Sequence, residues 1–101
     1  MIHVENIIYQ RRVINTVRRY DENILKFKPL ISKNSPPAKY LDETRINNVI
    51  EAWDDPDKTL PLISVDQLNT SIGTKYTVRD GNHRLAIYLL RGFERIPVHI
   101  L

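Results

Sequence analysis

The most informative stretch of this chain is residues 78–86, whose sequence is VRDGNHRLA. A β-rich run ends there at Asp80-Gly81, and a helix begins with the side chains of Asn82, His83 and Arg84. Glycine permits a tight turn, and the first N–H groups of a helix have no partners within the helix. The helix dipole adds partial positive charge at the same place. The sequence therefore predicts a cradle for an anion at residues 80–84.

The carboxyl-terminal part of the chain is expected to hold three strands and one helix, separated by turn-forming residues. The expected strands are rich in β-branched and aromatic residues and cover residues 60–65, 75–79 and 96–100. A hairpin connection is expected through residues 69–73. The helix is expected to run from Asn82 or His83 to Arg91, where Gly92 ends it.

Before residue 60, the pattern favours two helices and an edge strand. Apolar residues recur at helical spacing near the start, which predicts an amphipathic amino-terminal helix over about residues 4–20. Residues 24–31 alternate as in a strand, with Pro29 marking an edge or a bend. A second helix is expected from Asp42 or Thr44 to Trp53. Trp53 is expected in the core, with base stacking as the alternative.

This mixed order of helices and strands, without a long βαβ repeat, predicts the α+β class. A chain of 101 residues is long enough for one core, so a single domain over residues 1–101 is expected, with its motif-bearing core at about residues 60–101. In this domain a small mixed sheet packs with helices.

Composition limits the classes of function. The chain has no cysteine, which excludes disulfides, thiolate metal sites and thiol nucleophiles. It also has no apolar run long enough to cross a bilayer and no secretory signal at its start, so a cytoplasmic protein without membrane contact is expected. The acidic segment 54–57 is expected to form a turn, with a metal site as the alternative.

The net charge of +3 permits an anionic partner such as a nucleotide or nucleic acid. Much of this charge lies in two arginine pairs, Arg11-Arg12 and Arg18-Arg19, whose spacing of seven returns them to nearly the same helical face. Two interpretations follow: a solvated helix face, or a surface that contacts the phosphates of nucleic acid.

The chain also resembles a known superfamily. The order strand, Asp-Gly-x-His-Arg at 80–84, short apolar helix, glycine and Ile-Pro-Val at 96–98 is similar to the ParB/sulfiredoxin-like superfamily, which includes domains labelled ParB-like nucleases. The resemblance covers about residues 60–101. It implies the same fold and a nucleotide pocket at the helix start, because sulfiredoxins bind ATP there and ParB domains bind CTP. Gly81 matches the turn glycine, and His83 and Arg84 match the pair that contacts phosphate in sulfiredoxins.

Two departures from the family patterns argue against particular activities of the superfamily. Asn82 stands where sulfiredoxins have their catalytic cysteine, so sulfiredoxin activity is excluded. The arginine-rich ParB run is reduced here to a single arginine at Arg84, which argues against specific CTP clamping. The Asp-Gly-His-Thr-Arg pattern of free serine kinases is matched at Asp80, Gly81 and Arg84.

The resemblance gives each residue of the cradle an expected role toward ATP or another nucleotide with Mg²⁺. Arg84 offers a planar fork to two phosphate oxygens, and His83 adds a donor. Main-chain N–H groups around Asn82 close the site, while the Asn82 side chain is expected to cap the helix. Asp80 holds Mg²⁺, orients Arg84 or simply forms the turn.

The activity expected from this ligand is that of a phosphotransferase or nucleotidase. Such a reaction needs a carboxylate to activate water or a hydroxyl, and Glu43 and Asp42 are the candidates, with helix capping as the alternative role. Other possible functions are a ParB-like nuclease, a non-enzymatic DNA-associated module that uses the four arginines, and an accessory protein that binds a partner.

Overall fold

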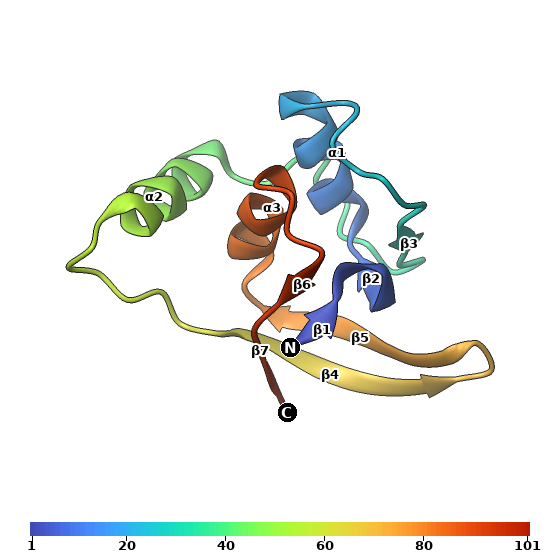
Figure 1. The fold of residues 1–101 in the computed structure, drawn as a ribbon. Helices are drawn as coiled ribbons and strands as arrows, with labels where there is room; N and C mark the ends of the chain where they lie inside the picture. The colour runs from blue at the N-terminus through green and yellow to red at the C-terminus, as the bar shows by residue number, and fades with distance from the viewer.

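The computed structural model describes residues 1–101 and shows three helices over one face of a mixed sheet (Figure 1). The helices are α1 (Arg11–Tyr20), α2 (Glu43–Asp54) and α3 (Asn82–Leu90). The strands are β1 (Ile2–His3), β2 (Ile7–Tyr9), β3 (Leu30–Ile31), β4 (Ile63–Thr70), β5 (Gly73–Asp80), β6 (Arg95–Ile96) and β7 (Val98–Ile100), and a short 3-10 helix, η1, covers Val4–Asn6. The α+β class is confirmed.

The main sheet has the strand order β3-β2-β5-β4-β7. Strands β4 and β5 form a long antiparallel hairpin, in which Val65 lies opposite Val78. The neighbours β2 and β5 are parallel, as are β2 and β3, and β4 and β7. Strands β1 and β6 form a separate antiparallel pair.

The parallel pairing of β2 with β5 determines where two helices begin. Ile8 lies opposite Thr77, so the carboxyl ends of both strands lie at the same edge of the sheet. Helix α1 begins shortly after β2, and helix α3 begins shortly after β5. The amino termini of α1 and α3 are thereby brought to one place, which is where open α/β sheets commonly bind ligands.

The core lies between the helices and the sheet and consists of sixteen buried apolar residues. Ile7 from β2, Val13 from α1, Ile46 from α2, Val65 from β4 and Leu85 from α3 are all inaccessible to solvent. Burial of this apolar surface is the main stabilising contribution to the fold. No helix has both the length and the apolar character needed to cross a membrane.

The predicted amino-terminal helix over residues 4–20 is wrong in its first half. The chain forms η1 and β2 before α1 begins at Arg11. In β2, Ile7 and Tyr9 are buried while Ile8 is only partly buried, which is the alternation of a strand. The buried hydroxyl of Tyr9 donates a hydrogen bond to the Val4 carbonyl oxygen across 2.7 Å. Residues 7–9 therefore form a strand that pairs with β3 and β5, although the spacing of the apolar residues also fits a helix.

The predicted strand at residues 24–31 is also largely wrong, because only Leu30–Ile31 pairs with a neighbour. The residues before it have no regular structure, although Ile24, Leu25 and Phe27 pack against the core. The remaining elements lie near their predicted positions, but β4 and β5 extend to a two-residue turn, and Pro97 divides the last strand into β6 and β7. Gly92 ends the α3 region with a positive φ of 76°, as expected.

Candidate anion-binding site

A cavity of about 320 Å³ opens where β5 ends and α3 begins. It receives side chains from all three helices, and Val49 is its one apolar lining residue. The lining residues are Arg12, Arg45, Asn48, Val49, Arg79, Asp80, Gly81, Asn82, His83 and Arg84. The structure thus brings the five residues of the predicted cradle together and adds three arginines to them.

Gly81 forms the turn between β5 and α3. Its φ of 115° lies in the range that favours glycine, and a Cβ here would lie 3.0 Å from Ile63 Cγ1. Gly81, and not Asn82, is the N-cap residue of α3, and no side chain caps this helix. The predicted capping role of Asn82 is therefore wrong, because Asn82 is already the first helical residue. Without a side-chain cap, the first N–H groups of α3 remain suited to a ligand.

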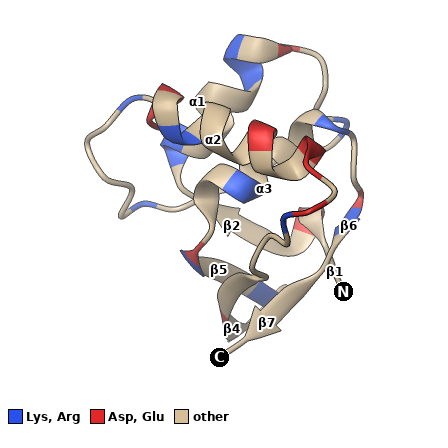
Figure 2. Cartoon of the chain, turned by 90° about the vertical axis from the view of Figure 1, so that its left-hand side faces the viewer, with Lys and Arg blue, Asp and Glu red and all other residues tan.

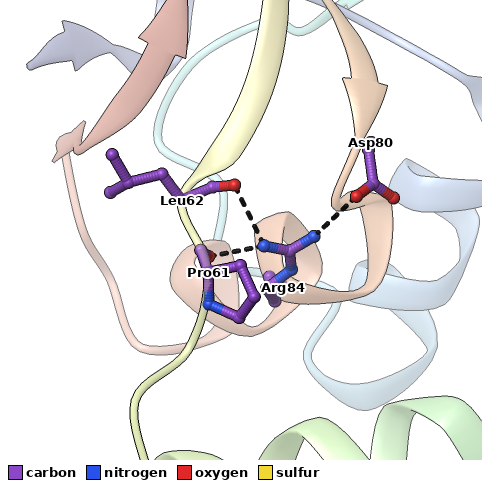
Figure 3. Close-up of polar contacts among 4 residues, drawn as sticks. All are labelled: Pro61, Leu62, Asp80 and Arg84. Carbon is purple, nitrogen blue, oxygen red and sulfur yellow. Dashed lines mark hydrogen bonds and ion pairs between the residues drawn. The ribbon is translucent and has the colours of Figure 1, made fainter.

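Arg84 is held by the protein itself (Figure 3). Its Nη1 donates hydrogen bonds to the main-chain oxygens of Pro61 and Leu62, and its Nη2 forms an ion pair with Asp80 across 3.2 Å. Only 12% of the Arg84 side chain is exposed. The structure therefore does not present Arg84 as the predicted fork for two phosphate oxygens. Its contacts join α3 to the start of β4, and Asp80 orients its guanidinium.

The four arginines of the cavity differ in their partners. Two of them are paired with carboxylates. Arg79 forms a bidentate ion pair with Asp66, with hydrogen bonds of 2.8 and 2.9 Å, and Arg84 is paired with Asp80. Arg12 and Arg45 form no ion pair. The Nε–H group of Arg12 donates a hydrogen bond to the Gln10 side-chain oxygen across 2.7 Å. These two guanidinium groups give the cavity its uncompensated positive charge.

His83 is the buried polar group of the cavity. It is 8% exposed, and its Nε2 atom is buried without a hydrogen-bond partner. Burial lowers the pKa of His83 below its usual value of 6.5, and the charges of Arg45 and Arg12 lower the pKa further, while Asp42 acts in the opposite direction. Burial and the nearby positive charge both disfavour protonation, so they favour the neutral imidazole. A buried polar atom without a partner is costly unless a ligand completes it.

The two predicted catalytic carboxylates do not line this cavity. Asp42 is the N-cap residue of α2, and its Oδ1 accepts a hydrogen bond from the Arg45 main-chain N–H across 3.0 Å. Glu43 lines a separate, smaller cavity together with Arg19 and Tyr40. Asp42 thus has the capping role that was the alternative to catalysis.

The residues present do not form a magnesium site by themselves. The structure contains no group of three or more His, Cys, Asp or Glu side chains that could hold a metal ion. Asp80 is the one carboxylate in the cavity lining, and it is paired with Arg84. At the acidic segment 54–57, the Asp55 carboxylate accepts from the Asp57 main-chain N–H across 2.9 Å, which is the expected turn.

Three of the four arginines of α1 have different neighbours. Arg12 lines the cavity described above, Arg19 lies over the Tyr40 ring at 4.9 Å, and Arg11 lines a third cavity beside residues 32–39. Figure 2 shows the basic residues on α1 and on the loop that leads to α2, whereas acidic residues gather at the end of α2 and along the chain after it. The shared face predicted from their spacing is thus divided among separate environments.

Sequence analysis did not identify Arg45, Asn48 or the role of Arg12 in this site. Arg45 and Asn48 lie on one face of α2, about one helical turn apart, and have no motif around them. They reach the cavity only because α2 packs beside α3 in the folded chain. The arginine pairs of α1 were noted, but their sequence spacing does not show which arginine faces α3.

Comparison of this chain with protein-family models, with curated proteins and with solved structures gives no match. The function of this chain is therefore inferred from the geometry of the site.

Proposed function

We propose that this cavity binds the phosphate group of a nucleotide or of another phosphorylated small molecule. The observation that carries the proposal is the position of Arg12 and Arg45. These guanidinium groups have no carboxylate partner and face the cavity at which α3 begins. An anion placed there would neutralise their charge and accept hydrogen bonds from both of them.

Two further features support a phosphate ligand. The first turn of α3 has no side-chain cap, so its N–H groups and its dipole favour a bound anion. His83 adds a buried Nε2 atom without a partner. Because these groups come from three helices, a bound anion would also hold α1, α2 and α3 together.

The resemblance of residues 80–84 to the ParB/sulfiredoxin-like superfamily supports nucleotides as the first ligands to test. The cavity itself favours contacts with phosphate over contacts with a base, because its lining is polar apart from Val49. Binding is the activity that this geometry supports. Phosphoryl transfer would need a free carboxylate near the phosphate, whereas Asp80 is paired with Arg84.

The proposal can be tested by thermal unfolding of the protein with inorganic phosphate, pyrophosphate, AMP, ADP, ATP and CTP, each with and without Mg²⁺. A ligand at about one hundred times its dissociation constant stabilises the folded state by about 2.7 kcal/mol. For a chain of this size, the expected rise in Tm is roughly 10 °C or more. The rise should be lost in Arg12→Gln/Arg45→Gln.

Arg18→Gln is the matched control, because Arg18 is an exposed arginine of α1 that does not line the cavity. This variant should keep the full response to the ligand. Unchanged Tm for every phosphate compound, or an equal loss of response in Arg18→Gln and Arg12→Gln/Arg45→Gln, would contradict the proposal. Arg84 is not substituted in this test, because loss of its contacts with Pro61, Leu62 and Asp80 should destabilise the fold.

A further inference from the structure

We infer that the cavity selects a phosphomonoester dianion over a phosphodiester monoanion. The inference rests on the proposed function, and it deepens that function by naming the ligand class. It distinguishes two sources of phosphate, because a nucleoside monophosphate or a sugar phosphate is a monoester, whereas the backbone of nucleic acid consists of diesters.

The first argument is the number of free donors. Arg45 has no side-chain hydrogen bond within the protein, and Arg12 uses only Nε. Each guanidinium can therefore direct a pair of N–H groups at the ligand, and the uncapped turn of α3 adds main-chain N–H groups. A phosphomonoester presents three unesterified oxygens to these donors. A diester presents only two and places an additional ester group in the cavity.

The second argument is the charge around the cavity. Of its charged lining residues, Arg79 and Arg84 are balanced by Asp66 and Asp80, whereas Arg12 and Arg45 are not balanced by an ion pair. Asp42 also acts on His83, but its carboxylate caps α2 and does not line the cavity. Two unpaired cations beside a helix amino terminus attract a dianion more strongly than a monoanion.

The third argument is the buried Nε2 atom of His83. The charges that act on the pKa of this imidazole are those of Arg45, Arg12 and Asp42. Three further charged residues, Arg79, Asp80 and Arg84, line the same cavity. Burial, and after it the charges of Arg45 and Arg12, favour the neutral form of this imidazole. It can therefore offer one N–H to the ligand without bringing a proton that titrates with the ligand. The second ionisation of a phosphomonoester, with a pKa of about 6, should then control binding near neutral pH.

The test compares AMP with its methyl ester, in which a methyl group on one phosphate oxygen makes the 5′-phosphate a diester. Binding of both compounds to the full chain is measured by calorimetric titration. At about pH 7.5, the expected preference for AMP is tenfold or more, roughly the effect of one charge-assisted hydrogen bond. At about pH 5.5, AMP is largely a monoanion, so its affinity should fall toward that of the methyl ester. Sulfate serves as the control dianion, since it keeps its charge over this range and should not lose affinity at the lower pH.

The variants His83→Leu and Arg18→Gln complete the test. His83→Leu removes the N–H donor without adding a charge, so it should reduce the preference for AMP while still binding phosphate. Arg18→Gln should retain the preference of the unmodified protein. Equal affinity for AMP and its methyl ester, or tighter AMP binding at the lower pH, would overturn the inference but leave the proposed function intact. Absence of binding by AMP, methyl ester and sulfate would overturn both.

Discussion

Arg84 Nη1 lies 3.0 Å from the main-chain oxygen of Leu62, so the first turn of α3 is joined to the residue before β4. The same guanidinium contacts Asp80 at the end of β5. A single side chain therefore joins three segments: the first turn of α3, the end of β5 and the residues before β4. In this chain the arginine of the Asp-Gly-Asn-His-Arg stretch is held by the protein itself, while Arg12 and Arg45 from the other two helices line the cavity.

Substitution of Arg84 should destabilise the fold. Arg84→Ala leaves the carbonyl oxygens of Pro61 and Leu62 without their donor and leaves Asp80 unpaired. The expected loss is about 1–3 kcal/mol in the free energy of unfolding, measured by urea denaturation. The matched control is Arg79→Ala, because Arg79 also has a carboxylate partner but its side chain is 64% exposed, so its loss should be about 1 kcal/mol or less. Equal losses in the two variants would refute the stabilising role of Arg84.

Substitution of Gly81 should disturb the turn that forms the cavity. The Cβ of Gly81→Ala would lie 3.0 Å from Ile63 Cγ1 and 3.2 Å from Arg84 Nη2, in addition to the strain of its positive φ. Gly73→Ala has a similar φ of 107° but meets no atom within 4 Å. Both variants should lose about 1–3 kcal/mol from backbone strain, and Gly81→Ala should lose more than Gly73→Ala. If chemical denaturation gives Gly73→Ala the larger loss, the close packing around Gly81 has no energetic consequence.

Thr16 connects α1 to the segment that leads into α2. Its buried hydroxyl donates to the Arg12 carbonyl oxygen across 2.7 Å and accepts from the Leu41 main-chain N–H across 2.9 Å. Thr16→Val should therefore lower the free energy of unfolding by about 1–3 kcal/mol, because a buried N–H group loses its acceptor. Thr16→Ser keeps the hydroxyl and should lose less. A greater loss in Thr16→Ser would show that the methyl group, and not the hydrogen bond, is what matters.

The pKa of His83 has a consequence for stability. Because the folded-state pKa lies below the unfolded value of 6.5, the unfolded chain takes up the proton first as the pH falls. Stability should therefore be complete above about pH 7 and should decrease as the pH falls through the unfolded pKa toward the folded one. His83→Gln removes this group, so the difference in unfolding free energy between about pH 7.5 and pH 5.5 should be smaller than in the unmodified protein. An equal or larger difference in the variant would contradict the assignment.

The sequence predicted the parts of the fold in which local signals agree with tertiary packing. In α2 the apolar spacing, the acidic N-cap Asp42 and the stop at Asp54 all favour a helix, and α2 forms there. Near the start of the chain, local and tertiary preferences differ. The positions of Val4, Ile7 and Ile8 fit a helix as well as a strand, and the choice depends on β5, which lies about seventy residues later in the sequence.

Only the part of the candidate site that is formed by consecutive residues could be predicted from the sequence. The turn at Gly81 and the start of α3 follow from local chemistry, so residues 80–84 could be identified. The directions in which their side chains point could not be predicted. Whether Arg84 faces a ligand or Leu62 depends on how the segment before β4 passes beneath α3, and the contributions of Arg12 and Arg45 depend on the packing of α1 and α2.

The most direct test of phosphate binding is a titration of ¹⁵N-labelled protein with inorganic phosphate, followed by two-dimensional amide NMR. Binding in the cavity should give saturable shifts that are largest at the main-chain N–H groups of Asn82, His83 and Arg84 and at the side-chain Nε–H groups of Arg12 and Arg45. Shifts that do not saturate, or that are largest at Arg18 and the other exposed basic residues away from the cavity, would contradict phosphate binding at this site.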